Sequence, residues 1–225
     1  MGRIAGEPGG LRSTATSSGR TVRAMKYDHT NVLADVCCKE RGVNTETLEQ
    51  VIVLAVEIAR EGREGRKVGT MFVVADTPEV LKNSHALILD PLYGHPEHLK
   101  RVDNPDARET LKELAQLDGA FVISDDGVAV SACRYIDASS KGITIPLGLG
   151  SRHVAAASIT KTTDAVAVVV SESSVVRVFD DGELIAEIIP ELWLLARYSH
   201  HLTGTIKEHK DEHITVLAKD SKASE

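Results

Sequence analysis

The chain has 225 residues, of which 42% are hydrophobic and 4% aromatic, and its formal net charge at pH 7 is −7. Broad, sequence-independent binding to nucleic acid needs a basic face, and single-strand binding needs aromatic stacking platforms, so this composition argues against both. A small phosphate ligand remains compatible with it, because a local basic pocket can lie in an acidic protein. The hydrophobic content suits one globular domain with a smaller addition.

The three cysteines include the adjacent pair Cys37 and Cys38, and no C-x-x-C pair occurs, so neither a disulfide framework nor a zinc site is expected. No window approaches the roughly 18 uninterrupted apolar residues of a transmembrane helix. Residues 1–26 carry scattered basic side chains among Gly, Ser and Thr, without the apolar stretch of a secretory signal. We therefore expect a disordered leader over 1–26 and a cytoplasmic protein.

Helix and strand patterns alternate in the first half of the chain. In "NTETLEQVIVLAVEIAREGREG", apolar residues recur at helical spacing after Asn44 or Thr45, either of which can cap the helix. The following "KVGTMFVVAD" is typical of a buried strand after a glycine. The predicted elements, in chain order, are a helix at 44–65, strands at 67–76 and 85–90, a loop at 92–107 and a helix at 106–117.

The second half contains hairpins of β-branched strands around two helical segments. "GAFVIS" and "GVAVSACRYI" flank an Asp-Gly turn, and "DAVAVVVSE" and "VVRVFD" flank a Ser-Ser turn. The predicted elements continue with strands at 119–124 and 127–136, a helix at 151–161, strands at 164–172 and 175–180, the segment 183–188, a helix at 190–202 and the segment 213–217. This intermixing predicts an α/β fold, a mixed central β-sheet flanked by helices (a sandwich), with a smaller N-terminal α/β segment.

The segment "GLGSRHVAAASITKTT" places a flexible glycine turn and then Ser151 at the start of a predicted helix. Exposed backbone N–H groups and the positive end of the helix dipole favour anions there, and Arg152 and His153 would add phosphate donors. The alternative is that Ser151 only caps the helix and the Arg–His pair is a solvated first turn. The segment is not a Walker A motif, because it lacks Gly-Lys-Ser/Thr.

Two carboxylates stand at the ends of predicted strands, and each has two interpretations. Asp118 beside Gly119 could bind a metal ion or accept a proton from a sugar hydroxyl, although a turn role is simpler. Glu172 is either a strand-end charge facing water or a ligand of a metal or substrate. Seven histidines match no standard metal pattern and are set aside, namely His85, His95, His98, His200, His201, His209 and His213.

Three motifs occur in a recognisable order: "LDGA" at 117–120, "GSRH" at 150–153 and "VSES" at 170–173. Together they resemble the signature of the diadenylate cyclase (DAC) domain, the family of the N-terminal domain of DisA. The resemblance runs over about 68–185 and looks most like the archaeal branch, in which a smaller N-terminal domain precedes the cyclase domain. The division it implies is a leader at 1–26, an N-terminal α/β portion at 27–105 (with the strand at 67–76 assignable to either part), a cyclase core at 106–217 and a flexible tail at 218–225.

The resemblance implies an activity, a metal and a partner. The protein would condense two ATP molecules into cyclic di-AMP and two pyrophosphates, the 3′-hydroxyl of one ATP attacking the α-phosphate of the other across a face-to-face homodimer or within a higher homo-oligomer. No DNA and no membrane partner is implied. The roles carried over are catalysis for Asp118, Arg152 and His153, binding of Mn²⁺ or Mg²⁺ for Asp118 and Glu172, and substrate binding for Gly119, Ala120, Ser151, Arg152, His153, Ser171 and Glu172.

One position departs from the family pattern. The second arginine of the Arg-His-Arg motif is Val154 here, which removes a phosphate donor worth about 1.5–3 kcal/mol if the bond is charge-assisted. Another cation, with Lys161 as one candidate, would have to compensate, or the triphosphate is held differently. Two other classes stay open: a catalytically inactive nucleotide or cyclic-dinucleotide sensor on the same fold, and a structural or partner-binding protein in which Asp118 only forms a turn.

Overall fold

The structure of the chain is a computed structural model. The structure describes residues 33, 36–137, 142–190, 206–210 and 215–219. The predicted leader at 1–26 lies outside the described residues, as do positions 191–202 of the helix predicted at 190–202. Within the described ranges, no helix is long and apolar enough to cross a membrane.

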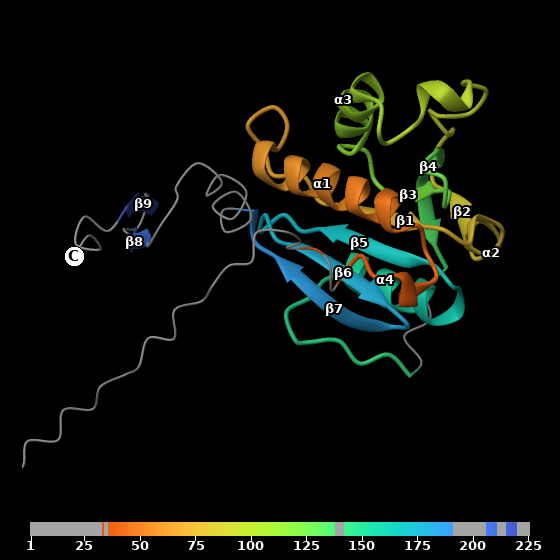
Figure 1. The fold of residues 1–225 in the computed structure, drawn as a ribbon. Helices are drawn as coiled ribbons and strands as arrows, with labels where there is room; N and C mark the ends of the chain where they lie inside the picture. The colour runs from red at the N-terminus through yellow and green to blue at the C-terminus, as the bar shows by residue number, and fades with distance from the viewer. Residues whose placement is uncertain (1–32, 34–35, 138–141, 191–205, 211–214, 220–225) are drawn as a thin grey trace, which may run out of the picture.

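A mixed β-sheet forms the centre of the molecule (Figure 1). Its order across the described part of the chain is β2-β4-β3-β1-β5-β6-β7. Strands β1 and β3 pair in parallel and every other neighbouring pair in this sheet is antiparallel. The strands are β1 (Thr70–Val74), β2 (Ser84–Ala86), β3 (Ala120–Ile123), β4 (Ala129–Ile136), β5 (Val166–Val170), β6 (Val176–Asp180) and β7 (Glu183–Ile188).

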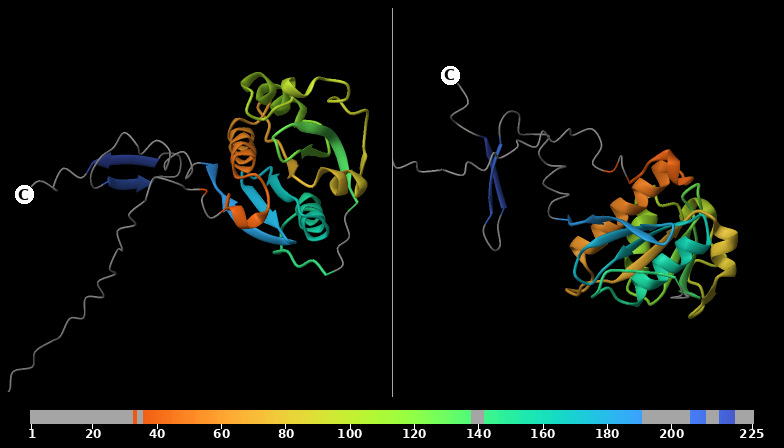
Figure 2. Two further views of the ribbon diagram at one scale, coloured as in Figure 1. Left: turned by 45° about the vertical axis from the view of Figure 1, so that its right-hand side comes forward. Right: turned by 90° about the horizontal axis from the view of Figure 1, so that it is seen from below.

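Helices cover both faces of the sheet, with α1 on one side and α4 on the other (Figure 2). The mixed α/β fold class is therefore confirmed. The described helices are α1 (Thr45–Glu61), α2 (Thr77–Lys82), α3 (Pro105–Leu114) and α4 (Ser151–Thr162), with 3-10 turns at Lys39–Arg41 and Glu97–Leu99. A separate hairpin consists of β8 (Ile206–Lys210) and β9 (Thr215–Lys219).

Strand β5 shows how the sequence fits this arrangement. Val166, Val168 and Val170 belong to the apolar core under α1, whereas Ala167 and Val169 belong to the core under α4. A strand buried on both faces reads as a continuous apolar run rather than as an alternation of apolar and polar residues. Small and β-branched side chains fill both cores, which suits a chain with so few aromatic residues.

The predicted helix at 44–65 is confirmed over most of its length as α1. The side chain of Asn44 caps it by accepting hydrogen bonds from the backbone amides of Glu46 and Thr47, at 3.0 and 3.2 Å. Helix α2 and strand β8 were not predicted from the sequence. The missed α2 is short, with six residues, and carries no long apolar stripe.

The strand predicted at 85–90 is wrong beyond Ala86. The Asp90 side chain accepts hydrogen bonds from the Ser131 hydroxyl and from the backbone amide of Ala132 on β4. These bonds hold the chain outside the regular ladder, so the apolar run before Asp90 lies on the surface, and Leu89 is 94% exposed. An apolar run of this length predicts burial only where another element covers it.

The division at residue 105 runs through the sheet. Strands β1 and β2 precede residue 105, and β3 to β7 follow it, yet all of them form one sheet. The division of the chain into the portions 27–105 and 106–217 stays a prediction.

Candidate functional site

A cavity of about 340 Å³ opens at the amino end of α4, where this helix passes the end of β5 and strand β6. Its lining combines a glycine-containing loop, the first turn of α4, the turn after β5 and one arginine from β6. The lining residues are Gly148, Leu149, Gly150, Ser151, Arg152, His153, Val169, Val170, Ser171, Glu172, Ser173 and Arg177.

Arg152 joins two of the motifs recognised in the sequence. Its Nη2 lies 3.6 Å from Oδ1 of Asp118, and its Nη1 lies 3.5 Å from Oε1 of Glu172. Both distances are long for a charge-assisted hydrogen bond. The carboxylates are largely in water, with side chains 90% and 71% exposed. The three side chains come from three separate segments, so the fold brings them together.

Asp118 is placed by a distorted part of the sheet. It precedes Gly119, whose φ of +109° lies in a region that favours glycine. A Cβ atom at Gly119 would lie 2.6 Å from the carbonyl carbon of Cys133 on β4, so the close approach of the two backbones also requires glycine. Cys133 itself has a φ of +55°, where the register between β3 and β4 shifts. This irregularity directs Asp118 out of the strand and into water.

The start of α4 has features that favour anions. Gly150 takes the N-cap position, and no side chain caps the helix there among the described residues. Ser151 is exposed in the first position of the helix. Backbone N–H groups in a first turn have no partner within the helix, and the helix dipole places partial positive charge at this end.

His153 is the buried polar group of the cavity, only 6% exposed. Its Nε2 lies 3.4 Å from Nη1 of Arg177, and its ring packs against Phe179 at a centroid distance of 6.1 Å. Burial lowers the pKa of His153, and the charge of Arg177 lowers it further, while the nearby Gly150 carbonyl opposes the shift. No hydrogen bond of ordinary geometry reaches Nδ1 from the residues that the structure describes.

The third motif forms a tight turn after β5. The Ser171 amide donates to the Val175 carbonyl at 3.0 Å, and the hydroxyls of Ser171 and Ser173 lie 2.9 Å apart. This turn presents Glu172 toward Arg152. Ser171 and Glu172 both line the cavity, and their predicted role in substrate binding stays a prediction.

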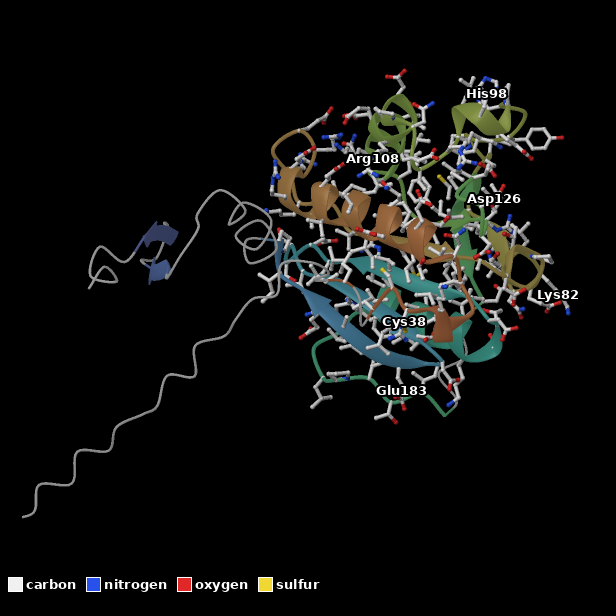
Figure 3. The ribbon with its side chains drawn as sticks, viewed as in Figure 1. Cys38, Lys82, His98, Arg108, Asp126 and Glu183 are labelled. Atoms are coloured by element: carbon white, nitrogen blue, oxygen red, sulfur yellow. The ribbon has the colours of Figure 1, made fainter. Side chains whose placement is uncertain are left out.

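The side chains of two residues considered in the sequence analysis do not face the cavity. Ala120 is 1% exposed and belongs to the apolar core under α4, so its side chain does not face the cavity. Lys161 lies in the last turn of α4 and donates to the Gly142 carbonyl at 2.6 Å, outside the cavity lining. Of the histidines set aside, His98 lies in a 3-10 turn away from α4 (Figure 3).

Sequence reasoning missed two residues of the site. A Cβ at Gly69 would lie 2.8 Å from Nη1 of Arg152 and 3.2 Å from Cγ of Glu172, so this glycine leaves room for the ion pair. Arg177 stands in a strand whose neighbours Val176 and Val178 are buried under α1. In the sequence, the one sign of Arg177 is a cation in a strand that is otherwise mostly apolar. Gly69 gives no sign beyond its position before a strand.

The structure is an α/β domain with a cavity at a helix start, lined there by Arg152, His153 and Arg177. A family model described as "DAC: DisA bacterial checkpoint controller nucleotide-binding" matches residues 57–184, more than half of the chain. The chain therefore belongs to the DAC family.

Two curated relatives are named diadenylate cyclase. The one from Methanocaldococcus jannaschii is 48% identical over 150 residues, which are 66% of this chain and 47% of the relative. The one from Haloferax volcanii is 43% identical over 147 residues, which are 65% of this chain and 54% of the relative. This chain thus spans about half the length of the curated relatives it matches.

A solved double mutant of DacA from Staphylococcus aureus is similar to this chain at 23% identity and a TM-score of 0.45, covering 74% of this chain and all of that one. A hypothetical membrane spanning protein from Bacillus cereus gives 19% identity and a TM-score of 0.46, with 62% of each chain covered.

Proposed function

We propose that this protein is a diadenylate cyclase, which condenses two ATP molecules into cyclic di-AMP and two pyrophosphates. The observation that carries the proposal is the convergence of Asp118, Arg152 and Glu172 beside a cavity at the start of α4. The match to the DAC family and the names of the two curated relatives support it.

The first turn of α4 would bind the triphosphate. The backbone N–H groups at Ser151 and Arg152 face the amino end of the helix, and the hydroxyl of Ser151 is exposed beside them. The Arg152 guanidinium adds a planar donor that suits phosphate oxygens. Gly119 lets the nucleotide approach the backbone next to Asp118, and Ser171 offers a hydroxyl at the opposite wall.

The reaction is a phosphoryl transfer from one ATP to the other. The 3′-oxygen of one nucleotide forms a bond to the α-phosphorus of the second, and the bond from that phosphorus to the bridging oxygen breaks as pyrophosphate leaves. The exposed Asp118 carboxylate accepts the proton of the 3′-hydroxyl. Arg152 and the buried His153 stabilise the charge that develops on the phosphate.

Ring closure needs the same transfer a second time, in the opposite direction. The two ATP molecules must then lie antiparallel, each held by one half-site. Two copies of the domain related by a twofold axis supply this arrangement, so the active species is a face-to-face homodimer. The exposure of Asp118 agrees with a carboxylate that works on a nucleotide held by the second copy.

A divalent metal ion fits the carboxylates of this site. Among the residues described, no group of three or more His, Cys, Asp or Glu side chains could hold a metal by itself. Mg²⁺ and Mn²⁺, however, take one or two protein carboxylates and complete their shell with phosphate oxygens and water. Asp118 and Glu172 supply such oxygens, and the ion would neutralise charge on the reacting phosphates.

The test is incubation of the purified chain with ATP and Mn²⁺, followed by chromatography and mass analysis for cyclic di-AMP. We expect product from the unchanged protein and a loss of at least about 100-fold in Asp118→Asn, because the proton acceptor is removed. Asp106→Asn, at an exposed carboxylate in the first turn of α3, is the matched control and keeps full activity.

Two results would contradict the proposal. Full activity in Asp118→Asn would remove the role given to that residue. Absence of product, with ATP still raising the melting temperature, would instead favour the nucleotide sensor considered from the sequence.

A further inference from the structure

Arg177 lies in the wall of the cavity although no motif marks it. It is on β6 between Val176 and Val178, which belong to the apolar core under α1. Alternation along the strand therefore turns Arg177 to the face covered by α4. There it lines the cavity with Arg152 and His153, and its side chain is 13% exposed.

One side of the Arg177 guanidinium is fixed by its neighbours. Its Nε lies 2.6 Å from Oε1 of Glu187, the residue directly across from it on β7. Its Nη1 lies 3.4 Å from Nε2 of His153. A guanidinium carries five N–H donors, and within the described part of the chain Nη2 has no hydrogen-bond partner.

The contact with His153 makes Nδ1 of His153 a second hydrogen-bond donor in the cavity wall. Because a guanidinium can only donate, the contact requires an unprotonated Nε2, so the neutral ring carries its proton on Nδ1. This Nδ1 is buried and makes no hydrogen bond of ordinary geometry to any described residue. The Gly150 carbonyl lies near this donor without ordinary hydrogen-bond geometry, and a ligand oxygen would satisfy the buried donor better.

The two arginines of the cavity differ in how their charge is balanced. Arg152 lies between the carboxylates of Asp118 and Glu172. Arg177 faces one carboxylate, that of Glu187, whose side chain is 53% exposed and therefore screened by water. The pair with Glu187 uses Nε of Arg177, so the Nη2 side of the guanidinium stays available to an anion.

A second cation is also the group that the sequence lacks at the start of α4. Val154 offers no phosphate donor, and it does not line the cavity. Lys161 is engaged with the Gly142 carbonyl. Arg177 reaches the same cavity from the strand side.

We infer that Arg177 binds a phosphate group of the nucleotide through the Nη2 side of its guanidinium, while Glu187 and His153 hold the other side in place. The inference rests on the proposed function, in which this cavity takes the triphosphate of ATP. It assigns a substrate-binding role to a strand residue outside the three motifs.

The test is calorimetric titration of the full chain with ATP and, separately, with inorganic tripolyphosphate. We expect Arg177→Met to weaken the binding of both probes by about 10- to 100-fold, the usual effect of losing a charge-assisted bond. Arg177→Lys, which keeps the charge but loses the planar fork, loses less. Arg101→Met is the matched control, because the Arg101 side chain is 40% exposed and pairs only with Asp103 among the described residues; it leaves both affinities unchanged.

The outcomes separate this inference from the proposed function. Equal affinities in Arg177→Met and the unchanged protein overturn the inference and leave the cyclase proposal standing. Arg177-dependent binding of tripolyphosphate by a protein that makes no cyclic di-AMP supports the inference and overturns the cyclase proposal. Failure of the unchanged protein to bind either probe overturns both. If Arg177→Met does not fold, Arg177→Lys decides: a loss of about 3-fold or more supports the role, and no loss removes it.

Discussion

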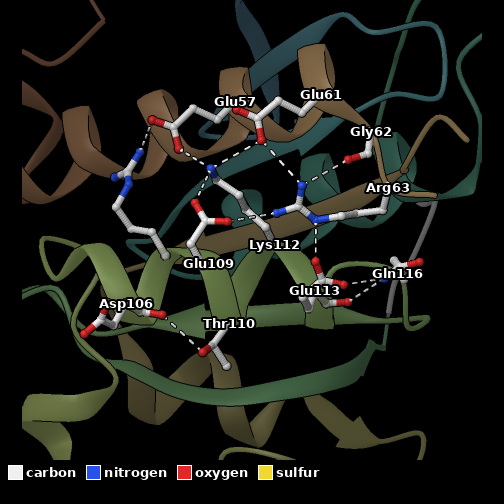
Figure 4. A network of polar contacts seen from close by, with 11 residues as sticks. Glu57, Glu61, Gly62, Arg63, Asp106, Glu109, Thr110, Lys112, Glu113 and Gln116 are labelled. Atoms are coloured by element: carbon white, nitrogen blue, oxygen red, sulfur yellow. Dashed lines mark hydrogen bonds and ion pairs between the residues drawn. The ribbon is translucent and has the colours of Figure 1, made fainter. Parts of the chain in front are cut away.

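The charged side chains between α1 and α3 and those around the start of α4 are arranged in opposite ways. Between α1 and α3, Lys112 is only 5% exposed and lies 2.8 Å from Glu109 and 3.1 Å from Glu57 (Figure 4). Glu57 also accepts from Arg108 at 2.8 Å, and Lys112 reaches Glu61 at 3.4 Å. Each cation here has close carboxylate partners, so the network is complete without a ligand.

The charged groups at the start of α4 lack such close partners. Arg152 lies 3.5 and 3.6 Å from its two carboxylates, which are exposed, and His153 keeps a buried nitrogen without a partner in the described ranges. Burial alone would lower the pKa of Lys112, but its bonds to Glu109 and Glu57 outweigh burial and raise it. No opposing bond of this strength acts on His153, whose pKa is lowered.

The difference separates charges that stabilise the fold from charges that are available to a ligand. A network satisfied within the protein has little to gain from an added anion. A set of donors with long contacts and an unpartnered buried nitrogen gains those bonds when phosphate oxygens arrive. A pair of matched substitutions, one in each region, tests this reading most directly.

Arg152→Met has the largest expected effect. It removes a donor that stabilises charge on the reacting phosphate, so we expect the rate of cyclic di-AMP synthesis to fall by about 100-fold or more. The melting temperature should stay nearly unchanged, because the two ion pairs lost are long and exposed. Rates from product chromatography and a thermal melt check both parts. A large drop in melting temperature with little loss of rate would show that Arg152 stabilises the fold rather than the reacting phosphate.

Lys112→Met is the counterpart and should act the other way. It removes the closest cation of Glu109 and leaves Glu57 with Arg108 as its close partner, so we expect the free energy of unfolding to fall by about 1–2 kcal/mol, with cyclase activity retained. Urea denaturation measures this change. Lys82→Met, at a lysine that is 71% exposed and paired with Glu79, is the control and should change stability by less than about 0.5 kcal/mol. Equal changes in the free energy of unfolding in the two variants would show that the network stabilises the fold no more than an exposed ion pair does.

Gly69→Ala sharpens the comparison within the site. The new methyl group would lie 2.8 Å from Nη1 of Arg152, the mobile end of a long side chain, so the guanidinium must move while the backbone stays in place. We expect about a 10-fold loss of activity from this displacement, with the urea midpoint nearly unchanged. The result to look for against this account is an unfolded or strongly destabilised variant, which would place the strain in the sheet instead.

The smallest effect concerns pH. Because the folded pKa of His153 lies below the ordinary value of 6.5, the unfolded chain binds the proton more readily. The contribution of His153 to stability is therefore fully present above pH 6.5 and is lost as pH falls from there through the lower folded pKa. Urea midpoints should fall less between pH 7 and about pH 5 in His153→Gln than in the unchanged protein. Identical falls of the urea midpoint in both proteins would contradict this role of His153.

The sequence contains the motifs of the candidate site residues but not the mutual geometry of these residues. Asp118, Arg152 and Glu172 each stand in a recognisable motif, and their convergence follows from the sheet order, which pairs β1 with both β3 and β5. That order, and hence the position of Arg152 between two carboxylates, depends on pairings between distant segments that a local pattern does not contain. Gly69 and Arg177 were missed for the same reason, since each acts through a neighbour from another element.

The fold was predicted best where local signals were long. Helix α1 has a capping residue and a sustained apolar stripe, and the hairpins have turn residues between β-branched runs. The segment after the edge strand β2 was predicted worst, because the exposed run 87–89 has the composition of a buried strand. Its exposure is decided by the hydrogen bonds of Asp90 to β4, which only the folded structure reveals.

The central position of β1 has a consequence for synthesis on the ribosome. Its parallel partner β3 and its antiparallel partner β5 both follow it in the chain, and the β5 pairing joins Thr70 to Val170. A nascent chain that has emerged only as far as β4 carries Asp118, but the cavity wall made by α4, β5 and β6 does not yet exist. Pairings between such distant segments form slowly and late. The growing chain is therefore unable to capture nucleotide until its central sheet is nearly complete.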